Sequence, residues 1–262
     1  MKIEVNSQTA YAYTGARELA SEQPTIVFIH GGGLDHSVWL LQSRYFAHHG
    51  KNVLAVDLPG HGRSGGDALP NIGAMADWIS ALLDALSIEQ ATVVGHSMGS
   101  LVALETAANH PSRVEKLVLI GTAVPMAVSD PLLDAAKANH HDAFDMVNLW
   151  GHSGLAQIGG NQAPGMWMTG GGVRLLERSR PGVLHNDLKA CHEYRHGLDS
   201  GARVQCPTLM LLGQLDMMTP VKVARDLQNA IVDARAVVLE RCGHMLMAEK
   251  PNQVLDNLVQ FI

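Results

Sequence analysis

The sequence of 262 residues has few cysteines, no run of basic residues and a low share of charged residues, and each shortage excludes a class of protein. Its three cysteines, Cys191, Cys206 and Cys242, are odd in number and show no paired spacing, which argues against a disulfide framework and favours a reducing compartment. Nineteen Lys and Arg against 25 Asp and Glu give a net charge of −6. Nucleic acid is therefore not an expected partner.

The sequence also lacks a long apolar run. The longest apolar stretch, residues 117–128, is interrupted by Gly121 and Pro125 and is too short to cross a bilayer. The first ten residues, MKIEVNSQTA, lack the apolar core of a secretion signal. We therefore expect a cytoplasmic protein with no membrane partner. The sequence does not fix the oligomeric state, and a homodimer is compatible with it.

Short apolar runs recur along the chain and alternate with helical patterns. A hydrophobic content of 47% in a chain of this length is enough to build a sizeable core. Between two of the runs, Ile72, Met75 and Ile79 follow the spacing of an amphipathic helix. Strands that alternate with helices predict an α/β fold with a doubly wound, mostly parallel sheet. The apolar runs are residues 25–29, 52–57, 91–94, 116–120, 207–213 and 234–240, and residues 2–13 form a weaker pair of edge strands.

The alternation stops after Gly121 for roughly 80 residues, which show helical and loop patterns but no buried strand. An insertion is the simplest interpretation. We therefore predict a core made of residues 1–121 and 202–262, with residues 122–201 inserted as a helical cap over the functional site.

Residues 91–100, ATVVGHSMGS, read as a strand, a sharp turn and a helix. Glycines on both sides of Ser97 allow neighbouring elements to approach closely, since they carry no Cβ atom. The turn would hold the Ser97 hydroxyl at the end of a strand and beside a helix N-terminus, whose free N–H groups favour negative charge. An acyl-transfer nucleophile needs this exposure, this fixed direction and a nearby place for an oxyanion.

A serine hydroxyl needs a base to become a nucleophile, and the base needs an orienting acid. Asp216 follows the apolar run that ends at residue 213, and His244 follows the run that ends at residue 240. Both lie where parallel strands end, so they can meet Ser97 above one edge of the sheet. Asp57, which follows an earlier strand, is the main rival for the acid.

These motifs together resemble the α/β-hydrolase family. The resemblance implies about eight strands with a helical cap after the sixth, and a catalytic triad of Ser97, Asp216 and His244. It also implies an oxyanion hole made by the N–H groups of Met98 and Gly32, with Gly33 or Leu34 as alternates for the second donor. The motifs that carry it are residues 30–32 (HGG), 57–64 (DLPGHGRS), 95–99 (GHSMG), Asp216 and residues 243–244 (GH).

The residues beside the proposed site indicate a pocket for an apolar group. We expect Gly33, Leu34, Met217 and Met245 to contact the substrate, because methionine side chains adapt well to an acyl or alkyl group. No His, Cys and Asp constellation has metal-ligand spacing, and no nucleotide-binding loop is present in the sequence. We therefore predict hydrolysis of small to medium carboxylic esters without a metal or an organic cofactor.

Several related activities stay open. Ser97 argues against the similar dehalogenases and epoxide hydrolases, which place aspartate there. The similar carbon–carbon hydrolases tend to have Asn before the serine and Trp after the histidine, where this sequence has His96 and Met245. Lactonase, thioesterase and carbon–carbon hydrolase activities remain alternatives on the same triad. A ligand-binding, receptor-like member with little turnover is an alternative from another class.

Overall fold

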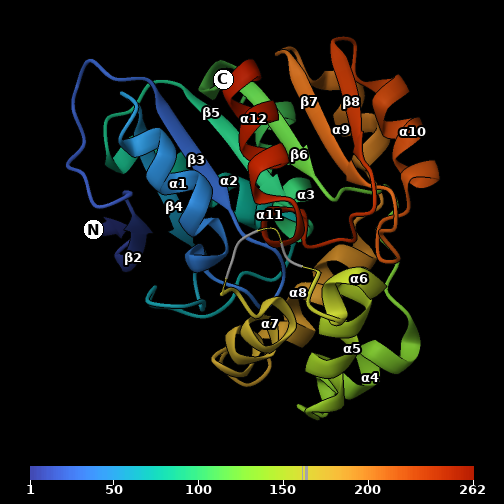
Figure 1. Cartoon of the computed structure of the whole chain (residues 1–262). Helices are drawn as coiled ribbons and strands as arrows, with labels where there is room; N and C mark the ends of the chain where they lie inside the picture. The colour runs from blue at the N-terminus through green and yellow to red at the C-terminus, as the bar shows by residue number, and fades with distance from the viewer. Residues whose placement is uncertain (161, 163–164) are drawn as a thin grey trace.

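The computed structural model describes residues 1–160, 162 and 165–262, and within them eight strands form one sheet (Figure 1). The strand order is β1-β2-β4-β3-β5-β6-β7-β8. The first two strands are antiparallel and the other six run parallel, which confirms the predicted fold class. The strands are β1 Lys2–Val5, β2 Gln8–Tyr13, β3 Thr25–Ile29, β4 Asn52–Asp57, β5 Ala91–His96, β6 Val114–Ile120, β7 Thr208–Gly213 and β8 Ala234–Leu239.

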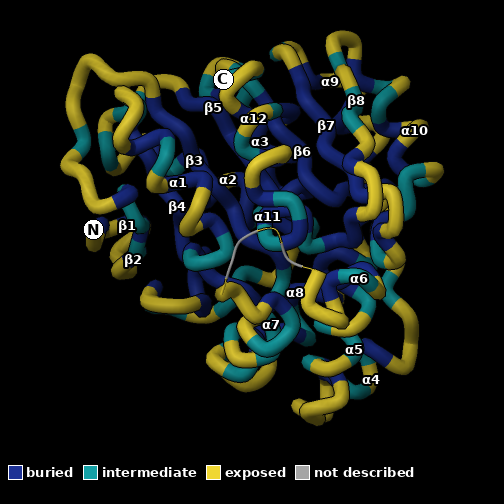
Figure 2. Tube along the Cα trace, in the orientation of Figure 1, coloured by how far each residue is buried: buried dark blue, intermediate teal, exposed yellow. Residues whose placement is uncertain are grey.

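Alternate residues of the central strands point into two separate hydrophobic clusters, one on each face of the sheet. In β3, Val27 belongs to the cluster under α2, α3 and α10, whereas Phe28 belongs to the cluster under α1 and α12. Because side chains alternate across a strand, a strand covered on both faces becomes apolar throughout. Figure 2 shows the resulting layer of buried strands. The flanking helices are η1 His36–Trp39, α1 Leu40–Ala47, α2 Ile72–Ala85, α3 Met98–Asn109, η2 Pro111–Arg113, α10 Val221–Ala230, α11 Leu246–Glu249 and α12 Pro251–Phe261.

A helix lies between β3 and β4, as the helical spacing of Val38, Leu41, Tyr45 and Phe46 predicts. Leu41 is 40% exposed, whereas Phe46 is buried. The segment starts as a 3₁₀ helix, which Asp35 caps by accepting the Ser37 N–H, and continues as α1.

Between β6 and β7 the described residues form helices and loops and no strand. These helices are α4 Asp130–Lys137, α5 Asp142–Gly151, α6 Gly154–Gln157, α7 Met168–Glu177, α8 Val183–Glu193 and α9 Gly197–Arg203. Figure 1 shows α4 to α8 grouped at one end of the sheet, and a small apolar cluster of their own includes Leu132, Ala143 and Leu184. Helix α9 packs on α3 and α10. None of the helices in the described ranges is long and apolar enough to cross a membrane.

The turn between β5 and α3 depends on two glycines. A Cβ atom on Gly95 would overlap the Gly99 carbonyl, and one on Gly99 would overlap the carbonyl oxygen of Ile29. These are backbone atoms on either side of a tight crossing, so they have no rotamer through which to move away. The close approach of α3 to β3 and β5 therefore requires glycine at both positions.

We expect Gly95→Ala to lower the free energy of unfolding by about 4 kcal/mol or more, the range of severe backbone and packing conflicts. Gly171→Ala in α7 is the matched control, because a Cβ there meets nothing within 4 Å. That change should be neutral or stabilise the helix by about 0.5–1 kcal/mol. Urea unfolding of both variants measures the difference, and equal midpoints would contradict the packing argument.

Candidate active site

Ser97 lies between the last residue of β5 and the first residue of α3. Its backbone has φ 53° and ψ −121°, a conformation that costs free energy for a residue with a Cβ atom. Hydrogen bonds hold it there: the Ser97 N–H donates to the Ile120 carbonyl at 2.9 Å, and its own carbonyl accepts from the Ser100 hydroxyl at 2.6 Å. Ser97 lines the main cavity of the described structure. The strained turn thus fixes the direction of the serine side chain.

Asp216, in the loop after β7, contacts His244, in the loop after β8. The Asp216 Oδ2 atom is 2.8 Å from the His244 Nδ1 atom, and both residues are buried. Thr219 also donates to the carboxylate, through its N–H at 2.7 Å and its hydroxyl at 2.6 Å. Burial alone would raise the pKa of Asp216, but His244 and Thr219 outweigh it and hold that pKa well below its usual range. Asp216 is therefore an ionised acceptor.

An ionised acceptor holds a proton of His244 on Nδ1, so the neutral form of the ring has its acceptor lone pair on Nε2. The Nε2 atom is buried and has no hydrogen-bond partner among the described residues. His244 shares the cavity wall with Ser97. Gly121, at φ 57°, leaves room for the imidazole, since a Cβ there would lie 3.1 Å from the ring. A bare nitrogen on the same wall as a serine hydroxyl is suited to general-base work.

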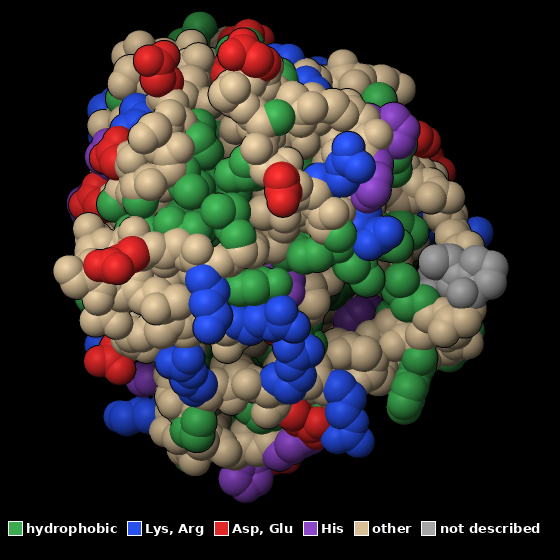
Figure 3. All heavy atoms as spheres, turned by 90° about the vertical axis from the view of Figure 1, so that its left-hand side faces the viewer, with side chains coloured by type: hydrophobic (Ala, Val, Ile, Leu, Met, Phe, Trp, Pro, Cys, Tyr) green, Lys and Arg blue, Asp and Glu red, His purple; other side chains and the backbone are tan. Residues whose placement is uncertain are grey.

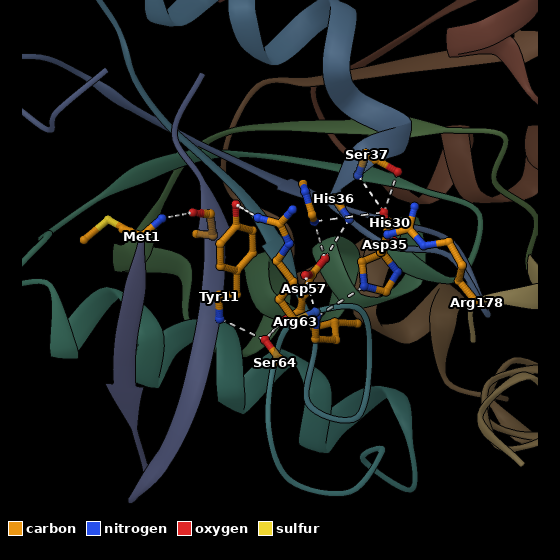
Figure 4. Close-up of polar contacts among 12 residues, drawn as sticks. Met1, Tyr11, His30, Asp35, His36, Ser37, Asp57, Arg63, Ser64 and Arg178 are labelled. Atoms are coloured by element: carbon orange, nitrogen blue, oxygen red, sulfur yellow. Dashed lines mark hydrogen bonds and ion pairs between the residues drawn. The ribbon is translucent and has the colours of Figure 1, made fainter. Parts of the chain in front are cut away.

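Asp57, the rival for the acid, is hydrogen-bonded elsewhere. Its Oδ1 atom accepts from the N–H and Nδ1 of His36 at 2.7 and 2.8 Å, and its Oδ2 atom accepts from the Arg63 N–H at 2.8 Å (Figure 4). These bonds tie the loop after β4 to the start of η1. In the structure Asp216 contacts His244, and Asp57 supports the loops beside the site.

The ligand-type atoms of Asp35, His36 and Asp57 lie within 4.8 Å of one another, a grouping that sequence spacing alone did not reveal. Asp35 accepts from the N–H and hydroxyl of Ser37 and from Arg178 at 3.0 Å (Figure 4). With the Asp57 carboxylate similarly occupied, the protein's own donors already supply the hydrogen bonds that these buried acids need. We interpret this group as a structural network.

The candidate oxyanion donors differ in what their N–H groups contact. The Gly33 N–H donates to the Asp187 carboxylate at 2.8 Å, and the Leu34 N–H donates at 3.2 Å to the carbonyl three residues earlier. Both alternates are therefore occupied. Gly32 and Met98 line the cavity beside Ser97, with Met98 as the first residue of α3. Their role as the oxyanion hole stays a prediction.

The cavity above these groups has a volume of about 300 Å³ and mostly apolar walls. Leu34, Met217 and Met245, expected to contact the substrate, all line it, whereas Gly33 is absent from its described lining. Helices α4, α5, α7 and α8 supply much of the wall. Their lining side chains include Leu132, Val147, Asn148, Trp150, Leu176, Leu184, Asp187, Leu188 and Cys191.

Sequence reasoning missed two polar residues here. Thr219 stands three residues after Asp216, the spacing at which an aspartate caps a turn, so this signal was readable. Asp216 in fact does both, because it caps the turn through Oδ1 and holds His244 through Oδ2. Asp187 lies in α8 and reaches the site only through the tertiary fold, so no local pattern could identify it.

Two buried histidines beside the site are neutral. Burial and the nearby His244 lower the pKa of His96 to about 3, and its Nε2 atom donates to the His244 carbonyl at 2.9 Å. Burial and the neighbouring His61 lower the pKa of His30 to about 4. His30 donates from Nδ1 to the Gly31 carbonyl and accepts the Leu58 N–H at Nε2, so it joins two loops as a neutral ring.

We expect acid to destabilise the protein through these two histidines. Below the ordinary histidine pKa of 6.5 the unfolded chain binds protons at both positions, whereas the folded chain stays neutral down to about pH 4 at His30 and about pH 3 at His96. The free energy of unfolding therefore decreases as the pH is lowered below 6.5, by about 1.4 kcal/mol per pH unit for each histidine. The raised pKa of His61 does not oppose this decrease, because the stability that a protonated His61 adds is fully present at every pH below 6.5.

Urea unfolding at pH 6.5, 5.5 and 4.5 measures the slope. His96→Asn should give a shallower slope than the unchanged protein, because the variant lacks one of the two groups. Equal stability at pH 6.5 and 4.5 would show that these rings do protonate in the fold.

Comparison with known proteins identifies the family of the chain. A family model described as alpha/beta hydrolase fold matches residues 24–155, and one described as TAP-like protein matches residues 191–261. The pimeloyl-[acyl-carrier protein] methyl ester esterase of Aromatoleum aromaticum is 32% identical over 87% of this chain and 94% of that protein. The (E)-2-((N-methylformamido)methylene)succinate hydrolase of Acinetobacter baylyi is 24% identical over 95% of this chain and 92% of that protein.

Among solved structures, the enol-lactonase from Burkholderia xenovorans LB400 has a TM-score of 0.88 at 23% identity, covering 100% of this chain and 99% of that one. This similarity shows the shared fold. Together with the family match over residues 24–155 and the 32% identical relative, it confirms the resemblance seen in the sequence motifs. The chain is a hydrolase that belongs to the alpha/beta hydrolase fold family.

Proposed function

We propose that the protein is a serine hydrolase that cleaves carboxylic esters of small to medium, largely apolar substrates. The main support is the bare Nε2 atom of His244, which is oriented by Asp216 and shares one cavity with the strained Ser97. A buried imidazole nitrogen without a partner costs free energy, and a serine hydroxyl or a substrate would satisfy it. The esterase of 32% identity supports an ester as the substrate class.

In the proposed reaction the Ser97 hydroxyl attacks the acyl carbon while His244 Nε2 takes its proton. The N–H groups of Met98 and Gly32 would stabilise the oxyanion of the tetrahedral intermediate. His244 then gives the proton to the leaving alcohol, and the ester of Ser97 remains. Water attacks this ester with His244 again as the base, which releases the acid and restores the serine.

The walls of the cavity support an apolar acyl group. Methionine and leucine are the commonest residue types around it, and the volume is about 300 Å³. The carboxylate of Asp187 is paired with His61 at 2.7 Å, so it does not offer the cavity a free charge. Apolar burial would therefore provide most of the binding free energy for the acyl part.

A lactonase is the second candidate. In the opening of a cyclic ester the leaving alcohol stays attached to the acyl group, so one cavity holds the whole reacting molecule. The compact cavity under the cap helices suits that requirement, and the same triad would act by the same steps. A panel of p-nitrophenyl esters, lactones, thioesters and vinylogous diketones would separate these activities.

We expect Ser97→Ala to lower ester turnover by about four to six orders of magnitude, because the variant lacks the nucleophile. A fluorophosphonate should label the unchanged protein once per chain and leave the variant unlabelled. Ser112→Ala, at an exposed serine in η2, is the control and should keep full turnover and labelling. Undiminished turnover in Ser97→Ala would remove the assignment.

The two candidate acids can be separated by a matched pair of variants. Asp216→Asn should lower kcat by about 10⁴-fold, since an amide no longer fixes the proton on His244 Nδ1. Asp57→Asn removes an acceptor from His36 and Arg63, so it should lower the thermal midpoint while kcat per folded molecule is retained. The reverse pattern would make Asp57 the acid.

A further inference from the structure

Asp187 is a fully buried carboxylate that α8 brings to the edge of the core. Its Oδ2 atom accepts the Gly33 N–H at 2.8 Å and lies 2.7 Å from the Nε2 atom of His61. It thereby contacts the loop after β3 and the loop after β4 at once. The approach is close, because a Cβ atom on Gly32 would lie only 3.2 Å from the Cβ atom of Asp187.

The partner of Asp187 carries a positive charge. His61 faces the Pro59 carbonyl through Nδ1 at 3.0 Å and the Asp187 carboxylate through Nε2. Both partners are acceptors, so the ring must donate from both nitrogens. Burial opposes this, but the Asp187 carboxylate outweighs burial and raises the pKa of His61. Asp187 and His61 thus form a buried ion pair with no net charge.

We propose that Asp187 is a positioning residue for the oxyanion hole: it holds the Gly33 N–H and so sets the direction of the preceding N–H, that of Gly32. Gly33 has φ 68°, and without this bond a glycine readily adopts other backbone conformations. The inference rests on the proposed function, since it concerns the oxyanion donor of that reaction. His61 also supports the oxyanion hole, because its positive charge balances the Asp187 carboxylate. Without that balance the carboxylate would repel a nearby oxyanion.

The same region holds other bonds between cap helices and the core. Arg178 pairs with Asp35 at 3.0 Å (Figure 4), and Arg180 donates to the Ser64 carbonyl at 2.6 Å. On the face shown in Figure 3, Lys and Arg side chains gather over the lower part of the molecule, where Figure 1 places the cap helices. These bonds seat α7 and α8 on the loops after β3 and β4. The geometry of the oxyanion loop therefore depends on a seated cap.

Asn186 offers a matched control beside Asp187. Its side-chain amide donates to the Leu69 carbonyl at 2.8 Å, so it also joins α8 to the core, and to the Asp187 Oδ1 atom at 3.3 Å. Asn186→Ala removes these two bonds and leaves the Oδ2 atom of Asp187 as the acceptor of the Gly33 N–H. Asp187→Ala removes such a bond and the Gly33 acceptor as well. The difference between the two variants isolates the effect on the loop.

The test measures kcat and KM for a p-nitrophenyl ester together with the amide exchange rate of Gly33 by NMR. We expect Asp187→Ala to lower kcat by about 100-fold, as for the loss of one oxyanion donor, with KM changed less than about three-fold. Exchange at Gly33 should become faster. Asp187→Asn keeps an oxygen acceptor for Gly33 and should recover most of the kcat that Asp187→Ala loses. Asn186→Ala should retain kcat within about three-fold.

A second pair of variants covers the case in which Asp187→Ala does not fold. His61→Gln leaves the carboxylate without its counter-charge and should lower kcat, whereas adding Asp187→Asn to it removes that charge and should restore most of the loss. Equal kcat for Asp187→Ala and Asn186→Ala, or no restoration in the double variant, would overturn the inference. If the unchanged protein shows neither ester turnover nor fluorophosphonate labelling at Ser97, the proposed function fails instead.

Discussion

The crossing of α3 over the ends of β3 and β5 is the constraint on which the site depends. The backbone of Ser97 turns with φ 53° because Gly95 and Gly99 let three main chains lie in contact. The cost of that turn is offset by the buried strands on either side, whose side chains fill two clusters of the core. A rigid sheet therefore holds the hydroxyl of Ser97 in place, and the loops after β7 and β8 need only position Asp216 and His244 beside it.

The charges of the site follow from what each histidine nitrogen faces. His244 has a carboxylate at Nδ1, and His96 and His30 each have a carbonyl at one nitrogen, so one proton satisfies each of these three rings. His61 faces acceptors on both sides and needs two protons. His96 and His30 are therefore neutral, and the cation His61 is paired with Asp187.

How much could be predicted from the sequence depended on how local each signal is. The strand that leads to Ser97 and the loops of Asp216 and His244 were predicted because parallel strands end at one edge. Asp187 was missed because its contact with Gly33 joins residues 154 positions apart, and nothing in either segment marks it. The roles of residues that follow the ends of strands could be predicted from the local sequence, whereas contacts between helices α4 to α8 and the loops of the sheet could not.

The reacting groups come from loops of the sheet, while much of the cavity wall comes from helices α4 to α8. Because of this division, substitutions in the helices that line the cavity can change substrate preference while the reacting groups are retained. The bond from Gly33 to α8 limits that freedom. A replacement for these helices would have to bring an acceptor to the same point, so selection on substrate preference would also act on catalytic speed.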